Sequence, residues 1–264
     1  MSNPSPEHLE YLKKAKLGKL LVLASQALIL AAFFGAWELA ARLKLIDAFI
    51  FSQPTRIINA AVSLAASGSL AKHIGATLWE SVLGFVLSTV IGTLMAMLLW
   101  WNDFLKKTLN PYLVVLNSLP KTALAPIIIV WIGNNVKSVI FTAVMTSVIV
   151  TILTVLTGFM EVSKDKIKLV EAFGGTKRQV LSKVVLPASI PAIVNALEIN
   201  IGLSFVGVMV GEFLVAKSGL GYLIIYGSQI LKMDWVMLSI IILCALAAIL
   251  HQLVVLFEKR IINQ

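Results

Sequence analysis

Apolar and polar residues follow one another along this chain in long blocks, and the lengths of the apolar blocks predict its architecture. A helix needs about 20 mostly apolar residues to cross the hydrocarbon core of a bilayer. Six segments meet this condition, at about residues 20–41, 76–101, 109–132, 138–159, 189–215 and 234–257. The pattern therefore predicts an all-α, polytopic membrane protein with six transmembrane helices.

Polar segments divide the chain around these spans. A leader covers residues 1–19, the transmembrane domain 20–257, a long polar segment within that domain 160–188, and a tail 258–264. The leader begins like a helix, with Ser5 as a candidate N-cap and Pro6 suited to the first helical position. Two interpretations of the leader stay open, a helix lying on the membrane surface or a solvated tail.

The composition excludes a soluble domain and offers no catalytic chemistry. Of the 264 residues 59% are hydrophobic and 13% charged, whereas soluble domains are about half apolar and a quarter charged. The single cysteine, Cys244, lies in an apolar block, so no disulfide or cysteine metal site can form within one chain. The histidines show no metal-ligand spacing, and nucleotide-binding and hydrolase motifs are absent from the sequence. We therefore expect no enzyme activity, no metal and no cofactor in this chain.

The distribution of basic residues predicts the orientation. With the N-terminus inside, fourteen of the 22 Lys and Arg residues lie in inside segments and seven in outside loops, with Lys121 in the third span. Because cytoplasmic loops are enriched in Lys and Arg, both termini are expected in the cytoplasm. The net charge of +9 does not indicate a nucleic-acid partner, since the basic residues are scattered over short loops.

Small residues at regular spacing predict two helix-packing faces. The second span carries Gly84, Ser88, Gly92 and Ala96, one small residue every four positions, and the fifth span carries Gly207 and Gly211. Lipid removes the hydrophobic drive between helices, so membrane helices associate closely through such residues. We expect both faces to contact other helices rather than a ligand.

Charged side chains inside the spans identify candidates for a pathway through the membrane. Placing a charged side chain in a membrane helix costs about 2.5–3.5 kcal/mol on insertion scales, so the presence of each one requires an explanation. Structural pairing or contact with the interface is the first interpretation for all of them, Glu38, Glu80, Glu198, Lys121 and Glu212. Lys121 stands in a span interrupted by Pro111, Pro120 and Pro126, which are expected to kink it. Glu212 comes just before a glycine-rich outer loop, so we predict a pathway near Lys121, Pro120, Pro126 and Glu212.

The polar segment between the fourth and fifth spans shows the signals of two short helices joined at a glycine corner. The run SKDKIKLVEAFGG predicts the first helix, with Ser163 at its N-cap and Gly174 in the left-handed position that ends it. Thr176 and Gln179 form a capping box for the second helix, which Pro187 is expected to close. Its apolar face is Val180, Leu181, Val184 and Val185. An idle loop needs neither caps nor a double glycine, so the segment is predicted to dock onto another protein.

The run EAFGGTKRQVLSKVVLPASIPAIVNAL resembles the cytoplasmic signature of the permeases of binding-protein-dependent ABC importers. That signature reads Glu-Ala-Ala, three residues, Gly, and then a spaced Leu-Pro. Anchored on the Leu-Pro at 186–187, the motif glycine is Gly174, and the Glu-Ala-Ala positions are 168–170, which read Lys-Leu-Val. The acid of the visible Glu-Ala, Glu171, is three residues out of register. The charge pairing of the docking surface is therefore expected to depart from the family pattern.

Three further stretches resemble the nitrate/sulfonate/taurine-type permeases in the correct order. They are FSQPTRI (51–57) before the second span, the proline-rich LNSLPKTALAPIIIVWIG (116–133), and GEFLVAKSGLGYLI (211–224) with its glutamate and Gly-Leu-Gly. The resemblance extends over roughly residues 50–260. No single stretch is decisive, but the occurrence of all of them in the same order is specific to the family.

The resemblance implies the type I ABC importer transmembrane fold and a permease of a bacterial cytoplasmic membrane. Two copies of the chain would line one pathway, and two ATPase subunits, which hold the ATP and Mg, would lie beneath it. The coupling residues implied are Lys168, Leu169, Val170, Glu171, Ala172, Phe173, Gly174, Gly175, Thr176 and Lys177. An extracytoplasmic binding protein would deliver the substrate to outer loops 44–74 and 216–233, with Gly219, Gly221 and Tyr222 as docking candidates.

Alternatives stay open for the transported substrate and for the energy source of transport. The related permeases carry small anions such as nitrate, sulfonates or taurine, and also vitamin precursors such as thiamine pyrimidines. Lys121 would suit an anion. An ion-coupled secondary transporter would show broken helices in both halves, whereas the prolines cluster in the third span alone. A membrane-embedded enzyme would need a cluster of His, Asp or Cys at one interface, which the sequence does not show.

Overall fold

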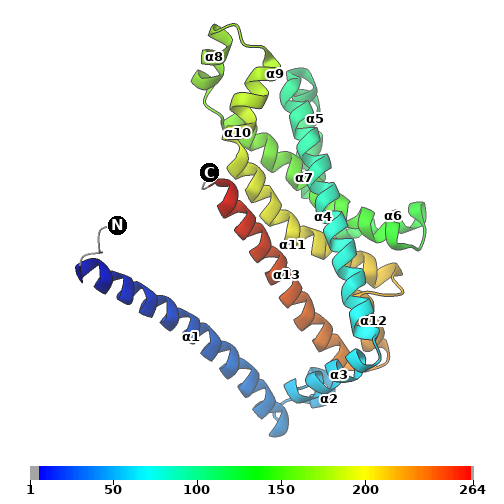
Figure 1. Ribbon diagram of the computed structural model, residues 1–264. Helices are drawn as coiled ribbons and strands as arrows, with labels where there is room; N and C mark the ends of the chain where they lie inside the picture. The colour runs from blue at the N-terminus through cyan, green and yellow to red at the C-terminus, as the bar shows by residue number, and fades with distance from the viewer. Residues whose placement is uncertain (1–5, 263–264) are drawn as a thin grey trace.

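The computed structural model describes the backbone of residues 6–262 and the side chains of residue 14 and residues 16–256. Within the described backbone all regular elements are helices (Figure 1). In chain order they are α1 (Pro6–Arg42), α2 (Ala48–Phe51), α3 (Pro54–Ala66), α4 (Ser69–Trp101), α5 (Asp103–Ser118), the 3₁₀-helix η1 (Lys121–Leu124), α6 (Ala125–Ile132), α7 (Val136–Glu161), α8 (Lys164–Ala172), α9 (Lys177–Val180), the π-helix η2 (Leu181–Val185), α10 (Leu186–Ala188), α11 (Ile190–Val215), α12 (Leu220–Gln229) and α13 (Met233–Ile262).

Five of the described helices are long and apolar enough to cross a membrane. They are α4, α7, α11, Lys16–Arg42 of α1 and Met233–Leu256 of α13. A sixth span results when α5 is counted with η1 and α6, although the two parts meet at an angle of 90°. The all-helical, polytopic architecture predicted from the apolar blocks is confirmed.

The three prolines of the third predicted span have different effects. Pro111 lies inside α5 without ending it, and Pro126 occupies the first turn of α6. The N–H groups of a first turn have no intrahelical acceptor, so the missing N–H of proline costs no hydrogen bond there. The break falls at Pro120, between α5 and η1, and it turns the chain by 90° so that α6 projects sideways (Figure 1). The predicted kink is thus one sharp bend.

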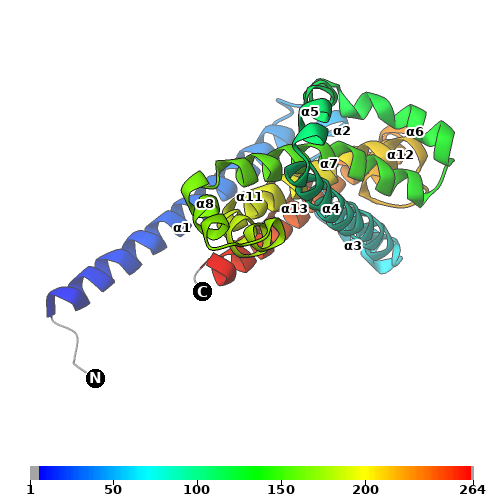
Figure 2. The same ribbon diagram turned by 90° about the horizontal axis from the view of Figure 1, so that it is seen from above.

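The leader is part of the first helix. From Pro6 onward α1 runs without interruption to Arg42, and Ser5, the expected N-cap, lies outside the described residues. α1 diverges from the other spans (Figures 1 and 2), and most of its described side chains are exposed. Its C-terminal end is held by Glu38, which accepts hydrogen bonds from Arg42 Nε at 2.7 Å and from the backbone N–H of Thr55 at 3.1 Å.

The core lies where α4 and α11 pack against α7. A Cβ built on Gly84 would lie 2.6 Å from Cβ of Ala143, and one built on Gly207 would lie 2.5 Å from Cα of the same alanine. Gly92 is equally close to α7, because its Cβ would lie 2.5 Å from Cβ of Thr151. Both predicted packing faces are confirmed, since a side chain larger than glycine at these positions would force the helices apart.

A buried polar contact adds to this core. Asn200 of α11 is fully buried, and its amide nitrogen donates to the hydroxyl of Thr151 on α7 at 2.6 Å and to that of Thr89 on α4 at 3.1 Å. Buried polar groups without partners are costly, so this amide specifies how the three helices align.

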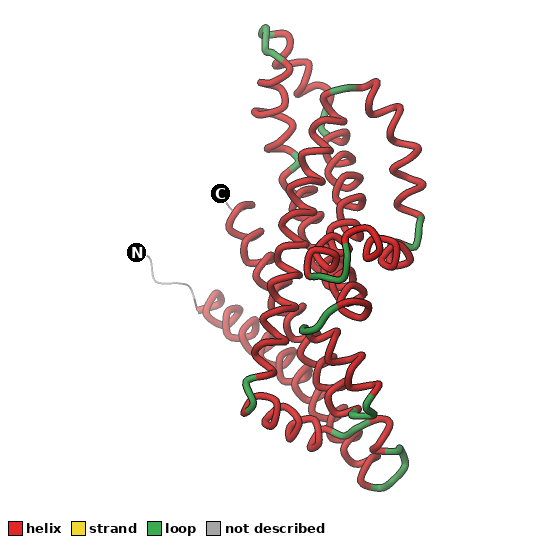
Figure 3. The backbone as a smooth tube through the Cα atoms, turned by 90° about the vertical axis from the view of Figure 1, so that its right-hand side faces the viewer, coloured by secondary structure: helices red, strands yellow, loops and turns green. Residues whose placement is uncertain are grey.

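The two ends of the bundle carry different structures. The α8–α9 segment lies at one end, and α2 and α3 lie at the other (Figures 1 and 3). α4 runs from the α3 end to the α8–α9 end, and these ends are named outer and inner after the predicted orientation.

Candidate coupling segment and outer loop

The inner segment has the predicted helix–corner–helix form. α8 follows Ser163 and ends before Gly174, which has the left-handed φ of 77°. The backbone N–H of Thr176 donates to Oε1 of Gln179 at 2.7 Å, and the hydroxyl of Thr176 accepts from the Gln179 N–H at 3.4 Å. The capping box and the glycine corner are therefore confirmed. Ser163 occupies the N-cap position, but its side chain makes no capping hydrogen bond.

The second helix was predicted to close at Pro187 and ends one residue later, at Ala188. It continues from α9 through the π-turn η2 into α10, where Pro187 is the second residue. Proline is tolerated in the first turn of a helix because its N–H would have no intrahelical partner there. The π-turn starts a new α-helical turn at Leu186 and so gives Pro187 such a place.

The segment has a buried base and an exposed tip. Val180 and Val185 are buried, and Ile167 and Val170 pack against the same core as Phe159 at the end of α7. At the tip, Leu169 is 59% exposed and Phe173 85% exposed. The other implied coupling residues are also on the surface, except for partly buried Val170 and Gly175, and they are Lys168, Glu171, Ala172, Gly174, Thr176 and Lys177.

Gly175 is required by packing as well as by the turn. A Cβ at this position would lie 2.7 Å from the carbonyl oxygen of Val170 and would collide with that residue's side chain. Together with the positive φ of Gly174, this fixes the angle between α8 and α9.

The bend in the third predicted span holds the pathway candidates. Lys121 is the first residue of η1, and its Nζ donates to Oδ1 of Asn117 on α5 at 3.0 Å, across the break. Pro120 and Pro126 are exposed on either side of it. The ammonium group is half-buried and forms no ion pair with a described residue.

Glu212 lies inside the outer end of the bundle. Its side chain is 1% exposed. One carboxyl oxygen accepts from the hydroxyl of Thr77 on α4 at 2.7 Å, and the other accepts from the backbone N–H of Gly221 at 2.6 Å. The carboxyl therefore joins α4, α11 and the start of α12.

The same site also accepts hydrogen bonds from backbone N–H groups at the start of α12. Leu220 donates its N–H to the Thr77 hydroxyl at 2.7 Å, and Gly219 donates to Nδ1 of His73 at 3.0 Å. The first N–H groups of a helix have no intrahelical acceptor, so α4 and Glu212 supply the acceptors for α12. Gly219, with a φ of 121°, leaves room for the Glu212 carboxyl, with which a Cβ would collide.

His73, Thr77 and Glu80 were not selected from the sequence as members of this site. Their spacing of four and three residues places them on one face of α4, and this was the signal that could have found them. His73 stacks on the ring of Tyr222, with centroids 5.7 Å apart. Glu80 is 2% exposed, so it does not reach the membrane interface, and its Oε2 has no hydrogen-bond partner.

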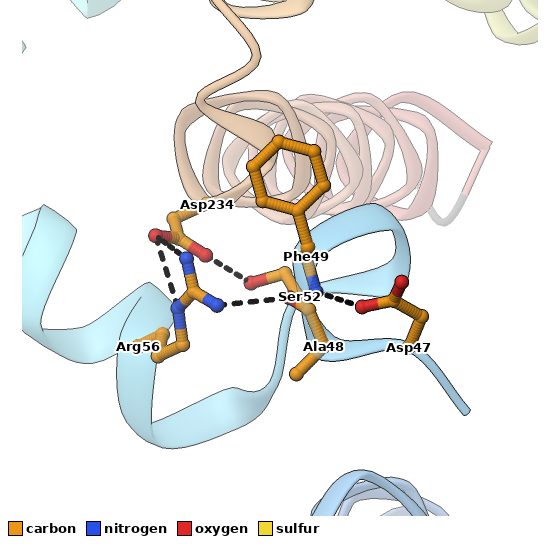
Figure 4. A network of polar contacts seen from close by, with 6 residues as sticks. All are labelled: Asp47, Ala48, Phe49, Ser52, Arg56 and Asp234. Atoms are coloured by element: carbon orange, nitrogen blue, oxygen red, sulfur yellow. Dashed lines mark hydrogen bonds and ion pairs between the residues drawn. The ribbon is translucent and has the colours of Figure 1, made fainter. Parts of the chain in front are cut away.

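A second polar contact fastens the outer helices α2 and α3 to α13 (Figure 4). Arg56 Nη2 lies 3.0 Å from Oδ2 of Asp234, and the hydroxyl of Ser52 donates to the other oxygen of that carboxylate at 2.7 Å. Arg56 Nη1 also donates to the carbonyl of Ala48 at 3.0 Å. The run at 51–57 is therefore a fixed support at the outer end of the bundle.

Comparison with known proteins identifies the family. Residues 88–263, two thirds of the chain, match the binding-protein-dependent transport system inner membrane component. The chain belongs to this family. It is a multi-pass permease subunit of an ABC transporter of the inner membrane.

Two relatives illustrate the range of the family. The chain is 30% identical over 186 residues to the formylaminopyrimidine transport permease protein ThiX of Halalkalibacterium halodurans, which covers 70% of this chain and 74% of that protein. It is 25% identical to the putative aliphatic sulfonates transport permease protein SsuC of Bacillus subtilis, over 89% of this chain and 86% of the relative. The match to sulfonate-type permeases agrees with the resemblance found in the sequence.

A solved structure confirms the fold. An inward-facing form of the MetNI methionine ABC transporter superposes with a TM-score of 0.64 over 75% of this chain and 98% of that chain, at 19% identity. The chain therefore has the transmembrane fold of a type I ABC importer.

Proposed function

We propose that this permease is driven by a separate ATPase, to which it couples through residues 163–187. The observation that carries the proposal is the exposed tip on a buried base. Leu169 and Phe173 present apolar surface to the solvent, and exposed aromatic anchors on a rigid support are typical of protein contacts. Movement of a docked ATPase would then reach the spans, because the base of the segment belongs to the core of the bundle.

The assembly we propose contains two copies of this chain, two ATPase subunits that hold ATP and Mg, and an extracytoplasmic binding protein. One side of α5 packs against the core through Leu105, Leu109 and Leu113, whereas Phe104, Tyr112 and Val115 are exposed. A second copy that covers α5 and α6 would enclose a pathway at the Lys121 bend. The segment 163–187 and both termini would face the cytoplasm, which follows from the excess of inside Lys and Arg.

The binding protein is proposed to dock at the outer loops 44–74 and 216–233. Gly219 and Gly221 are buried and Tyr222 is half-buried in the part of these loops that α4 and Glu212 hold in place, so these residues would shape the docking surface from beneath. Because binding surfaces change little when their backbone is already fixed, this loop is suited to receive a rigid partner.

For the substrate, we propose a small anion such as a sulfonate, taurine or nitrate. The supporting observation is the half-buried ammonium of Lys121 at the bend between Pro120 and Pro126, without a carboxylate partner among the described side chains. Glu212 is the weaker pathway candidate, since its carboxyl is enclosed by its own chain. A thiamine pyrimidine is the second candidate, supported by the 30% identity to the formylaminopyrimidine permease.

The coupling proposal is tested by replacing Gly174 and Gly175 with valine. Valine is strained at the φ of 77° and collides with Val170 at the second position, so the tip is expected to turn away from the ATPase. We expect the variant to remain in the membrane, to lose import, and to leave the ATPase without stimulation. Gly35→Val is the matched control, because a Cβ at Gly35 meets no atom within 4 Å.

Two outcomes count against the proposal. Unchanged import in the Gly174→Val, Gly175→Val variant would exclude the segment as the coupling element. Import by the purified chain alone, without an ATPase that co-purifies with it, would indicate an ion-coupled transporter.

A further inference from the structure

A side chain from the inner segment holds the inner end of α4. Lys177 Nζ donates a hydrogen bond of 2.7 Å to the backbone carbonyl of Trp101, the last residue of α4, which lies 76 positions earlier in the chain. The same ammonium lies 5.7 Å from the ring centroid of Trp100 and 5.8 Å from that of Trp101. The last carbonyls of a helix lack intrahelical partners and carry partial negative charge, so a cation there is favourable.

Lys177 lies in the part of the segment that packs against its own chain. Lys177 is the first residue of α9, directly after the Thr176 cap. The apolar tip consists of Leu169 of α8 and the C-cap residue Phe173, both before the corner and both exposed. The segment is therefore divided into a part that is free to meet a partner and a part that is attached to α4.

α4 continues from this attachment to the outer loop. It is one helix of 33 residues, about 50 Å long at 1.5 Å per residue. Near its other end, Thr77 and His73 accept the N–H groups of Leu220 and Gly219. One helix thus contacts the inner segment through Lys177 and the outer loop through Thr77 and His73.

We propose that Lys177 is a positioning residue that passes movement of the inner segment to α4, and through α4 to the loop at residues 216–221. The inference rests on the proposed coupling function of residues 163–187. Along the chain, the segment continues only into α7 and α11, and Lys177 adds a direct connection to α4. The rings of Trp100 and Trp101 hold the ammonium over the helix end, so the connection has a defined direction.

The test measures movement of the outer loop directly. The complex with its co-purifying ATPase is prepared with Lys217, an exposed loop residue, replaced by cysteine in a Cys244→Ser chain. The rate of maleimide labelling is then compared without nucleotide and with ATP plus vanadate. We expect an ATP-dependent change in this rate, and we expect Lys177→Gln to reduce the change at least about fivefold, the lower end of typical coupling between sites.

Two further variants separate positioning from a merely structural effect. Lys177→Arg is expected to keep the ATP-dependent change, because a guanidinium donates to the same carbonyl and stacks on tryptophan. Lys107→Gln, which removes an exposed lysine of α5 at the same end of the bundle, is expected to behave like the unchanged chain.

The outcomes distinguish this inference from the proposed function. If Lys177→Gln keeps the full change while Gly174→Val abolishes it, the role of Lys177 is overturned and the coupling segment stands. If Gly174→Val also keeps the change, the coupling segment itself is excluded. If Lys177→Gln lowers the amount of complex in the membrane and Lys177→Arg fails to restore it, Lys177 is structural and the inference is overturned.

Discussion

The two ends of α4 are held in different ways. At the outer end, Thr77 is fully buried and His73 is 7% exposed, and both accept backbone N–H groups of the outer loop. At the inner end, Lys177 is exposed to solvent where it bonds to Trp101. Breaking a buried hydrogen bond leaves unsatisfied groups, whereas water replaces an exposed one. The outer contact is therefore expected to stabilise the fold, and the inner contact to contribute little to the free energy of unfolding.

The largest effect in this comparison is expected from Glu212→Ala. The change leaves the Gly221 N–H and the Thr77 hydroxyl without their acceptor and opens a cavity. Each orphaned group costs about 1–3 kcal/mol. We expect a clear fall in the thermal-unfolding midpoint of the detergent-solubilised protein, with faster proteolysis of the loop at 216–221.

Glu212→Gln is the control for this variant, because its amide keeps the shape and one acceptor oxygen. It is expected to retain most of the stability. An alanine variant as stable as the unchanged chain would show that the outer contact does not stabilise the fold.

A smaller effect is expected from Thr77→Val, which keeps the shape and opens no cavity. The hydroxyl accepts from Leu220 and donates to Glu212, so its loss leaves one buried N–H unpaired, at about 1 kcal/mol or more. Hydrogen exchange of the Leu220 amide measures this directly. Thr77→Ser, which restores the hydroxyl, should return the exchange rate to that of the unchanged chain.

The smallest effect is expected at the inner end, from Asp103→Ala. Asp103 is paired with Lys106 at 2.7 Å, but its side chain is 73% exposed, and exposed ion pairs contribute about 0–1 kcal/mol. The unfolding midpoint should change little, and any small change should disappear at high salt. A loss as large as that of Glu212→Ala would remove the distinction between the two ends.

Local sequence signals predicted much of the inner segment and of the packing faces. The capping box at Thr176 and the left-handed Gly174 depend on neighbours within five residues, and the structure has both. Gly84 and Gly92 were identified by spacing alone, because small residues one turn apart must share a helix face. The apolar block lengths likewise predicted five of the spans, since bilayer thickness fixes the length of a crossing helix, whereas the block at 109–132 is divided by a bend of 90°.

Such local signals could not predict contacts between distant parts of the chain. The acceptors for the N–H groups of Gly219 and Leu220 come from residues more than 140 positions earlier, and no pattern within α4 names those partners. Pro187 was expected to end a helix, yet the π-turn before it changes the position that it occupies. The sequence placed Lys177 in a docking segment, but its attachment to Trp101 depends on the packing of α9 in the core cluster that also contains Leu99 of α4.

The amino-acid sequence alone determined the approximate limits of five long apolar helices, the glycine faces between them and the capped corner of the inner segment. Each of these depends on periodicity, length or hydrogen bonds between near neighbours. The tertiary structure decided that α4 joins the inner segment to the outer loop, because hydrogen bonds need both partners within about 3 Å. Only the packing of α4 against α7 and α11 brings His73, Thr77 and Trp101 that close to their partners.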